Sequence, residues 1–461
     1  MEARAVPERA PRQLRERRRE RAPGVYRTRM RVALAIFIIG ACSIELWNPL
    51  TGLQPWNMVM VACAAVALVI AVFARVLYGQ APAPRLFTFD YAYLAYLVWL
   101  WFSVTWSVSP SDTLVQCVYA TLPWLATIAL RTESLDRALT YILRFAAVTA
   151  VASLATVVLV PSQAFQPASS WIIPELRGVF EHQQRLGLFL GAVIGLVVIA
   201  QVNGDLSRLL GRSRLLKWTV LVVVPIASAW AFARLNGVYV VVAVLVVIGL
   251  TKNAAARFFS VTGFVVFLMW LTTSAETLLA GFGETGDGET FSGRANVWNR
   301  TLVAIDYAPD VGYGFATFNT PFFDDFWGGY RAPSAHNSYL QALFETGMIG
   351  VVLCSAVVIT QFAGALKAAA VLKRVPYSGF LVLLALLSSV SGVTYAGKPT
   401  VIFVLTLLVL GMERQQAAEV QRRRRESGEE VPLTRSAWRL SRRLARRLRG
   451  PDAAPHGRTA G

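Results

Sequence analysis

The chain has 461 residues, of which 55% are hydrophobic and only 16% are charged, with 45 Lys and Arg against 27 Asp and Glu. This composition excludes an ordinary soluble enzyme and is typical of an integral membrane protein. The net charge of +18 does not indicate a nucleic-acid groove, because residues 1–31 and 413–461 contribute +7 each and only +4 remains between them. We therefore expect no nucleic-acid partner.

Twelve apolar segments are candidates to cross a hydrocarbon core about 30 Å thick. The seventh and eighth could instead form one broken helix, because Arg234, Leu235 and Asn236 separate them. The sequence predicts an all-α, polytopic membrane protein of about 12 transmembrane helices. The segments are residues 32–50, 56–74, 86–106, 112–130, 138–160, 184–203, 216–233, 236–250, 258–275, 346–363, 377–396 and 399–412.

These segments divide the chain into five parts. We predict a basic tail at 1–31, nine spans within 32–275, a large extracytoplasmic loop with short helices at 276–345, three spans within 346–412, and a second basic tail at 413–461.

Lys and Arg collect in every second connection between the spans, and these connections and the two tails hold 37 of the 45 basic residues. Loops rich in Lys and Arg stay in the cytoplasm. We therefore expect a multi-pass protein of the cytoplasmic membrane with both termini in the cytoplasm. The first apolar run follows an Arg-rich tail without a convincing cleavage site, so we expect no cleaved signal peptide.

The C-terminal tail contains a candidate membrane-surface element. Residues 434–450 intersperse Trp and Leu with arginines, a pattern that fits a basic amphipathic helix on anionic lipids or a disordered basic tail.

The four cysteines lie singly within apolar runs. We interpret them as small hydrophobic residues rather than metal ligands or disulfides: Cys42, Cys63, Cys117 and Cys354.

Residues 276–345 form the longest hydrophilic stretch, and a loop of this length is usually functional. The glycine-rich run at 281–288 lacks the Gly-Lys-Ser/Thr of a phosphate-binding loop, so we interpret it as a flexible lid or connector. Ser292 is a candidate N-cap of a helix that Pro309 ends, with an apolar stripe at Val297, Thr301, Leu302 and Ile305.

Arg294 falls in the first turn of this predicted helix. A helix N-terminus presents unpaired backbone N–H groups, and an arginine there adds a fork suited to phosphate. The sequence thus predicts an anion site at Arg294. The alternative is an ion pair between Arg294 and Asp287 or Glu289.

An aromatic cluster follows the predicted helix, with two carboxylates among its members. Aromatic faces beside carboxylates suit sugar rings, although aromatic residues also gather at membrane interfaces. Two adjacent carboxylates alone are a poor ligand set for a divalent cation, so we predict no metal site. The residues are Phe315, Phe318, Phe322, Phe323, Phe326, Trp327 and Tyr330, with Asp324 and Asp325.

His336 and Asn337 precede the apolar segment that follows the loop. We expect His336 in the first helical turn, where the positive end of the helix dipole favours a neutral imidazole. A neutral imidazole can accept a proton from a hydroxyl, so His336 is a candidate general base. The alternative is a structural histidine.

Three further polar residues are expected near the outer ends of spans: Arg185 and His182 at the sixth, and Arg234 at the seventh. A guanidinium at hydrocarbon depth usually faces a cavity or a ligand. Snorkelling to lipid headgroups is the alternative explanation for both arginines.

Several of these motifs resemble those of the O-antigen ligase and O-antigen polymerase superfamily of bacterial membrane proteins. The resemblance covers residues 178–350 and has departures: Gln183-Gln184 replace the common Pro-Asn, and Ala233 precedes Arg234. The matching motifs are His336-Asn337 followed by Gly347-Met348-Ile349-Gly350, Ser292-Gly293-Arg294 with Trp298 and later Pro309, Gly312 and Gly314, the stretch Gly178 to Gly187, and Arg234.

The resemblance implies transfer of a glycan from an undecaprenyl-diphosphate carrier to an acceptor hydroxyl on the outer face of the cytoplasmic membrane. It implies that Arg234 and Arg294 bind the diphosphate and that His336 activates the hydroxyl, with inversion at the anomeric carbon. Substrate contacts are expected from Arg185, His182, Asn337 and Trp298, with no cofactor, metal or nucleotide. The acceptor is a glycan, a lipid or a wall component, and the motifs fit a ligase and a polymerase equally.

Two other functions remain compatible with the sequence. A transporter of a lipid-linked anion would also use many spans and buried arginines, but transporters tend to place polar residues at mid-membrane in broken helices. The distinctive residues here gather at the outer side, which favours an enzyme. A membrane anchor for a synthesis complex would leave His336 without a role.

Overall fold

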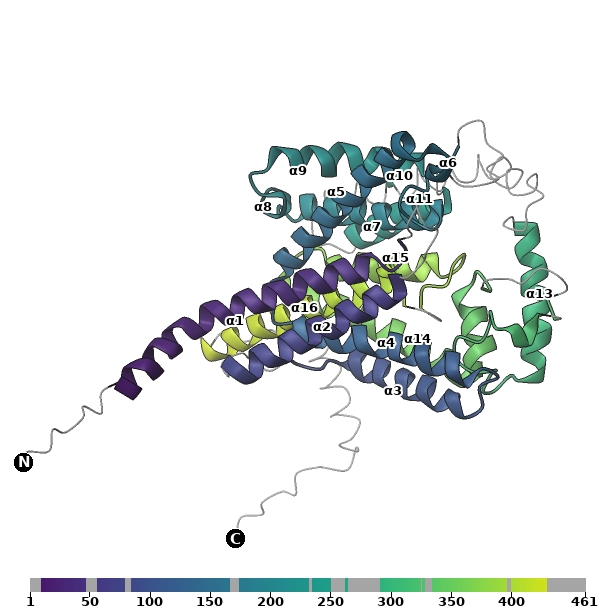
Figure 1. The fold of residues 1–461 in the computed structure, drawn as a ribbon, viewed down its shortest axis with the longest axis horizontal. Helices are drawn as coiled ribbons and strands as arrows, with labels where there is room; N and C mark the ends of the chain where they lie inside the picture. The colour runs from purple at the N-terminus through teal and green to yellow at the C-terminus, as the bar shows by residue number, and fades with distance from the viewer. Residues whose placement is uncertain are drawn as a thin grey trace, which may run out of the picture. The chain divides into compact units, whose positions relative to one another are not determined.

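The computed structural model describes residues 10–46, 56–78, 84–165, 174–231, 234–249, 262–263, 291–324, 326–327, 334–395 and 399–428. This part of the chain is all-helical (Figure 1). Its extended pairings are two isolated bridges, Leu46 with Phe180 and Phe165 with Leu176. The predicted all-α class is confirmed for these residues.

The helices follow one another in the order that the apolar segments predict. They are α1 (Ala10–Cys42), α2 (Trp56–Tyr78), α3 (Thr88–Phe102), α4 (Pro110–Leu130), α5 (Leu135–Leu159), α6 (Pro161–Ala164), α7 (Gln183–Val202), α8 (Leu206–Leu210), α9 (Arg214–Trp218), α10 (Val224–Trp230), α11 (Arg234–Gly249), α13 (Phe291–Tyr307), α14 (Ser338–Leu372), α15 (Tyr377–Ser388) and α16 (Val401–Glu426).

Six of the described helices are long and apolar enough to cross a membrane, and each falls on a predicted span. The shorter apolar helices Asn236–Gly249 and Tyr377–Ser388 coincide with two further predicted spans. The ninth predicted span, 258–275, lies almost wholly outside the described residues, so the count of about twelve stays a prediction. The six are Met58–Tyr78, Pro110–Leu130, Leu135–Leu159, Gln183–Val202, Ser338–Leu372 and Val401–Glu426.

The seventh and eighth predicted spans form separate helices. α9, a π-helical stretch at Thr219–Val223 and α10 follow one another without interruption up to Trp230. α11 then begins at Arg234. The separating residues Arg234, Leu235 and Asn236 are therefore the first residues of α11, and they do not lie between the two helices.

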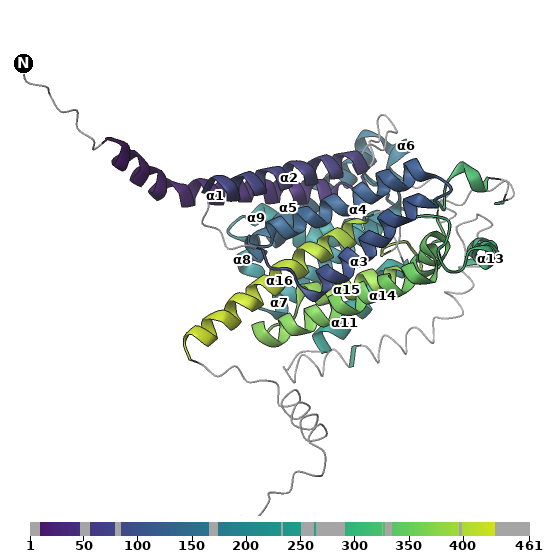
Figure 2. The same cartoon turned by 90° about the horizontal axis from the view of Figure 1, so that it is seen from below.

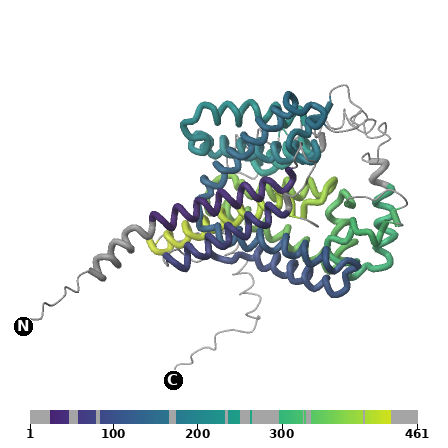
Figure 3. The backbone as a smooth tube through the Cα atoms, in the orientation of Figure 1, coloured from purple at the N-terminus to yellow at the C-terminus, as the bar shows by residue number. Residues whose placement is uncertain are grey.

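Small residues allow α1 and α2 to pack closely, and the pair lies side by side in both views (Figures 2 and 3). A Cβ atom at Gly40 would lie 2.3 Å from the Cβ atom of Cys63. Ala64, Ala67 and Ala71 are buried along one face of α2. Close approach of helix backbones through small residues is the usual basis of helix association in membranes.

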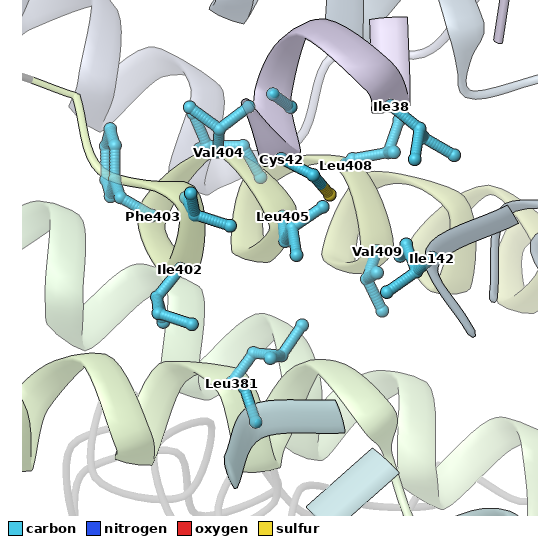
Figure 4. Packing of buried hydrophobic residues seen from close by; sticks show 14 of the residues in the cluster. Ile38, Cys42, Ile142, Leu381, Ile402, Phe403, Val404, Leu405, Leu408 and Val409 are labelled. Atoms are coloured by element: carbon cyan, nitrogen blue, oxygen red, sulfur yellow. The ribbon is translucent and has the colours of Figure 1, made fainter. Parts of the chain in front are cut away.

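α16 is the central helix of the described core, because 83% of its most apolar stretch is buried, against 28% for α2. Its Ile402, Leu405 and Val409 belong to the same buried cluster as Ile38 of α1 and Leu381 of α15 (Figure 4). Cys42 and Cys117 are buried in this cluster too, and all four cysteines are free thiols, as their interpretation as small hydrophobic residues requires.

Two helices extend beyond the predicted spans into the predicted tails. α1 starts at Ala10, well before residue 32, and α16 continues to Glu426, past residue 412. The predicted amphipathic stretch 434–450 lies outside the described residues.

Candidate active-site corner

A kink in α14 anchors residues 309–314 to the helix. Gly347 has φ 64° and ψ −169°, which interrupts the helical hydrogen bonding. The N–H of Met348 donates instead to the carbonyl oxygen of Pro309 at 2.9 Å, and that of Ile349 to Asp310 at 3.4 Å. Only glycine fits here, because a Cβ atom would lie 2.1 Å from the Asp310 oxygen.

Residues 309–314 also supply hydrogen-bond partners for the carbonyl groups that precede the kink. Phe344 and Glu345 accept hydrogen bonds from the backbone N–H groups of Tyr313 and Gly314, at 3.1 and 2.9 Å. Gly312 passes so close that a Cβ atom would lie 2.6 Å from the Phe344 oxygen. The glycines at 312, 314 and 347 therefore have a packing reason in this chain.

His336 lies just before α14 and not, as expected, in its first turn. α14 begins at Ser338, and Asn337 is its N-cap, whose side-chain oxygen accepts from the N–H groups of Tyr339 and Leu340 at 2.9 and 3.1 Å. An asparagine at the N-cap satisfies the first free N–H groups better than a histidine inside the helix would. His336 is half-buried and has φ 47°, a left-handed conformation that is uncommon for a non-glycine residue.

The residue before His336 is held on both sides. The indole N–H of Trp298 donates to the Ala335 carbonyl oxygen at 2.8 Å, and the Ala335 N–H donates to Oε1 of Gln341 at 2.8 Å. Gln341 in turn donates to Glu345, and both side chains are buried. This clamp fixes the backbone from which His336 projects.

The segment after α15 forms the other wall of the corner. The predicted eleventh span, 377–396, ends early, since α15 stops at Ser388 and the chain turns toward α14. The Ser338 N–H donates to the Ser389 carbonyl oxygen at 2.8 Å, and the Ser338 hydroxyl donates to Gly392 at 3.1 Å and accepts from the Thr394 N–H at 2.8 Å. Ser338 is fully buried.

The same segment connects the corner to α11. The Tyr239 hydroxyl of α11 bonds to Ser391 at 2.9 Å. One turn earlier, the amide of buried Asn236 donates to the Gln184 carbonyl oxygen of α7 at 2.8 Å. A chain of hydrogen bonds therefore links the start of α14, the start of α11 and the start of α7.

The backbones of Arg234 and Arg294 are attached to this frame. Arg234 is the first residue of α11, two positions before Asn236. Arg294 is in the first turn of α13, as predicted, and lies one helical turn before Trp298, which bonds to the residue preceding His336. The side chains of both arginines, and the alternative partners Asp287 and Glu289, lie outside the described residues.

α13 confirms the predicted helix with two corrections. It begins at Phe291, so Ser292 lies within the first turn rather than at the cap. Val297, Thr301 and Ile305 are buried as expected, whereas Leu302 is 46% exposed because Ala304 faces the core in its place.

Arg185 and His182 both have protein partners at the start of α7. Arg185 Nη1 lies 2.9 Å from Oε1 of Glu45, a buried carboxylate at the end of α1, while the arginine side chain stays 45% exposed. His182 is the N-cap, and its Nδ1 accepts the Gln184 N–H at 3.2 Å. A contact of either residue with substrate stays a prediction.

Most of the aromatic cluster packs on itself instead of presenting faces for sugars. Phe318, Phe323 and Trp327 are buried against Phe344 of α14, with ring centroids 4.8–6.4 Å apart. Phe322 is the exception, at 64% exposed. Asp324 is exposed, whereas Asp325 and Tyr330 lie outside the described residues.

Tyr313 joins this small core to α13. Its hydroxyl donates to the Ala304 carbonyl oxygen at 2.7 Å. Burial, and to a smaller extent the neighbouring Tyr307, raise the pKa of Tyr313 above its usual value.

Sequence reasoning missed the residues that hold the corner, chiefly Gln341, Tyr239 and Ser338. One signal was available: the run Ser388-Ser389-Val390-Ser391-Gly392 is rich in turn-forming residues and could have ended the eleventh span earlier. Gln341 and Tyr239 carry no such signal, because their partners are distant in sequence.

Comparison with known proteins gives one partial likeness. No family model matches the chain. Over 93 residues, the chain is 33% identical to the exopolysaccharide production protein ExoQ of Rhizobium meliloti (strain 1021). The match covers 18% of this chain and 21% of that protein, about a fifth of the relative's length.

Proposed function

We propose that this protein is a metal-independent membrane glycosyltransferase of cell-surface polysaccharide biosynthesis. It transfers a glycan from an undecaprenyl-diphosphate donor to an acceptor hydroxyl on the outer face of the cytoplasmic membrane. The observation that carries the proposal is the hydrogen-bonded frame that joins the His336 turn to the helix starts bearing Arg234 and Arg294. The partial likeness to an exopolysaccharide production protein supports the same process.

In the proposed reaction, the acceptor oxygen attacks the anomeric carbon while the imidazole of His336 takes its proton. The bond from that carbon to the diphosphate oxygen breaks, and the electron pair leaves with undecaprenyl diphosphate. Arg234 and Arg294 stabilise the charge of the leaving diphosphate. Attack opposite the leaving group inverts the anomeric centre.

The clamp on Ala335 supports the assignment of His336 as the base. A left-handed backbone at a non-glycine residue is unfavourable and persists only where the surroundings fix it. The hydrogen bonds of Trp298 and Gln341 to Ala335, and the N-cap by Asn337, supply that constraint. Such pre-organisation is typical of residues that act on a substrate.

The test is an assay with purified protein in nanodiscs, a chelator and a radiolabelled undecaprenyl-diphosphate glycan. Wild type should release undecaprenyl diphosphate and form a glycan product, whose size distinguishes a ligase from a polymerase. His336→Ala should reduce turnover about 100- to 10,000-fold with donor binding retained. Arg294→Ala should weaken both turnover and donor binding.

Matched controls come from the same chain. His456→Ala in the C-terminal tail and Arg212→Ala in the basic loop before α9 should leave turnover unchanged. If His336→Ala turns over as fast as wild type, His336 is not the base. If wild type moves the labelled lipid across a vesicle membrane without cleaving it, the protein is a transporter.

A further inference from the structure

An arginine lies inside a membrane-spanning helix far along the chain from the proposed active site. Arg144 is exposed on α5 and is its tenth residue. Arg137 and Tyr141 precede it at helical spacing, and the same face continues with Val148 and Val151, which are 67% and 49% exposed. An exposed apolar face on a membrane span faces lipid, so Arg144 lies at the border of the lipid-facing surface.

Arg144 also borders a cavity. An open cavity of about 350 Å³ is lined by Ser134, Asp136, Arg137, Thr140, Tyr141 and Arg144. The lining combines two guanidinium groups with three hydroxyls and one carboxylate. This set of donors suits an anionic oxygen ligand.

The carboxylates near Arg144 already form ion pairs with other arginines, whereas Arg144 itself has no such partner among the described residues. Glu133 pairs with Arg137, and Asp136 pairs with Arg208 at 3.0 Å. Within the part of the chain that the structure describes, Arg144 has no ion pair or hydrogen bond. An uncompensated guanidinium in a span is costly unless it meets an anion or reaches the headgroup region.

We infer that Arg144 and the adjoining cavity bind the phosphate of an anionic phospholipid. The guanidinium of Arg144 donates to two phosphate oxygens, the hydroxyl of Tyr141 one turn earlier adds a further donor, and an acyl chain lies along Val148 and Val151. With the predicted orientation, this end of α5 borders the cytoplasmic leaflet, whose anionic lipids attract basic residues. The inference is independent of the proposed glycan transfer.

Native mass spectrometry of the detergent-purified chain tests the inference. Phosphatidylglycerol and phosphatidylcholine with identical acyl chains are titrated separately, and the bound lipids are counted. Wild type should retain phosphatidylglycerol preferentially, and Arg144→Gln should weaken its affinity about five-fold. Arg212→Gln, which removes one charge from the same basic end without touching the cavity, should bind phosphatidylglycerol as tightly as wild type.

One more variant and a competition experiment distinguish specific lipid binding from attraction by charge alone and from binding of free phosphate. Arg144→Lys keeps the charge but removes the two-pronged donor, so it should bind about two-fold more weakly than wild type. Inorganic phosphate at millimolar concentration should not displace the lipid. The inference is overturned if Arg144→Gln or Arg144→Lys binds phosphatidylglycerol like wild type, or if inorganic phosphate competes with it fully.

Discussion

Ser338 and Ser389 share a backbone hydrogen bond of 2.8 Å, although 51 positions separate them in the chain. This bond docks the start of α14 on the segment that follows α15. Because His336 lies two residues before Ser338 and Tyr239 bonds to Ser391, the contact controls the position of the candidate base relative to α11. The bond is thus one of the contacts that hold the start of α14 against the helical core.

Ser338→Ala should destabilise the protein and slow turnover. The substitution leaves the buried N–H of Thr394 and the carbonyl group of Gly392 without their partner, which costs about 1–3 kcal/mol. The midpoint of thermal unfolding in detergent is the measurement. Ser427→Ala, at an exposed hydroxyl that bonds only to its own helix, should shift that midpoint little; equal effects of the two changes would contradict the docking role.

Gly347→Ala should be more damaging than Gly211→Ala. Both glycines have nearly the same φ, 64° and 61°, so the conformational penalty is similar. Only Gly347 faces the backbone of Asp310, whereas nothing lies within 4 Å of a Cβ atom at Gly211. The difference in unfolding free energy should be about 1–3 kcal/mol, measured by denaturant titration of both variants. Identical losses would mean that the kink tolerates a side chain.

Gln341→Leu should reduce kcat about 10- to 100-fold while leaving KM for the donor nearly unchanged. The change removes the acceptor of the Ala335 N–H and so frees the backbone that carries His336. In a His336→Ala background it should have little further effect, because both changes act on one group. Gln415→Leu, at another buried glutamine, is the control for stability alone, and additive losses in the double variant would exclude a positioning role.

Alkaline pH should weaken the contact between Tyr313 and α13. Because the pKa of Tyr313 is raised in the folded protein, its neutral hydroxyl contributes stability that is full below about pH 10 and is lost as pH rises through the raised pKa. Tyr313→Phe should lower the unfolding midpoint near neutral pH and flatten its decline between pH 9 and 12. Tyr91→Phe, at an exposed tyrosine of α3 that does not contribute to the raised pKa of Tyr313, should retain the wild-type decline. A Tyr313→Phe profile parallel to wild type would exclude this residue as the cause.

The apolar segments were predictable because their ends carry local signals. α4, α5 and α7 begin and end within about three residues of the predicted spans, since Pro110, Ser134 and His182 each mark a helix start. The helix at Phe291–Tyr307 was likewise predictable from its apolar spacing and from Pro309.

The corner itself was not predictable in detail. The end of α15 at Ser388 is set by hydrogen bonds of the following residues to Ser338, which lies in another helix. The N-cap at Asn337 displaces His336 from the helix, a distinction of two residues that spacing cannot resolve. The ion pair of Arg185 with Glu45 joins segments 140 positions apart, so no local sequence pattern predicts it.

The hydrogen bonds around Gly347 restrict which segments of this chain can be replaced by engineering. Residues 309–314 supply the hydrogen-bond partners that the interrupted helix lacks, so this segment and α14 stabilise one another. A chimera with a foreign segment in place of residues 309–314 would leave the peptide groups at the kink without these partners, and an unpaired buried peptide group is costly. A functional exchange of residues 309–314 with a related protein would therefore require exchanging α14 with them.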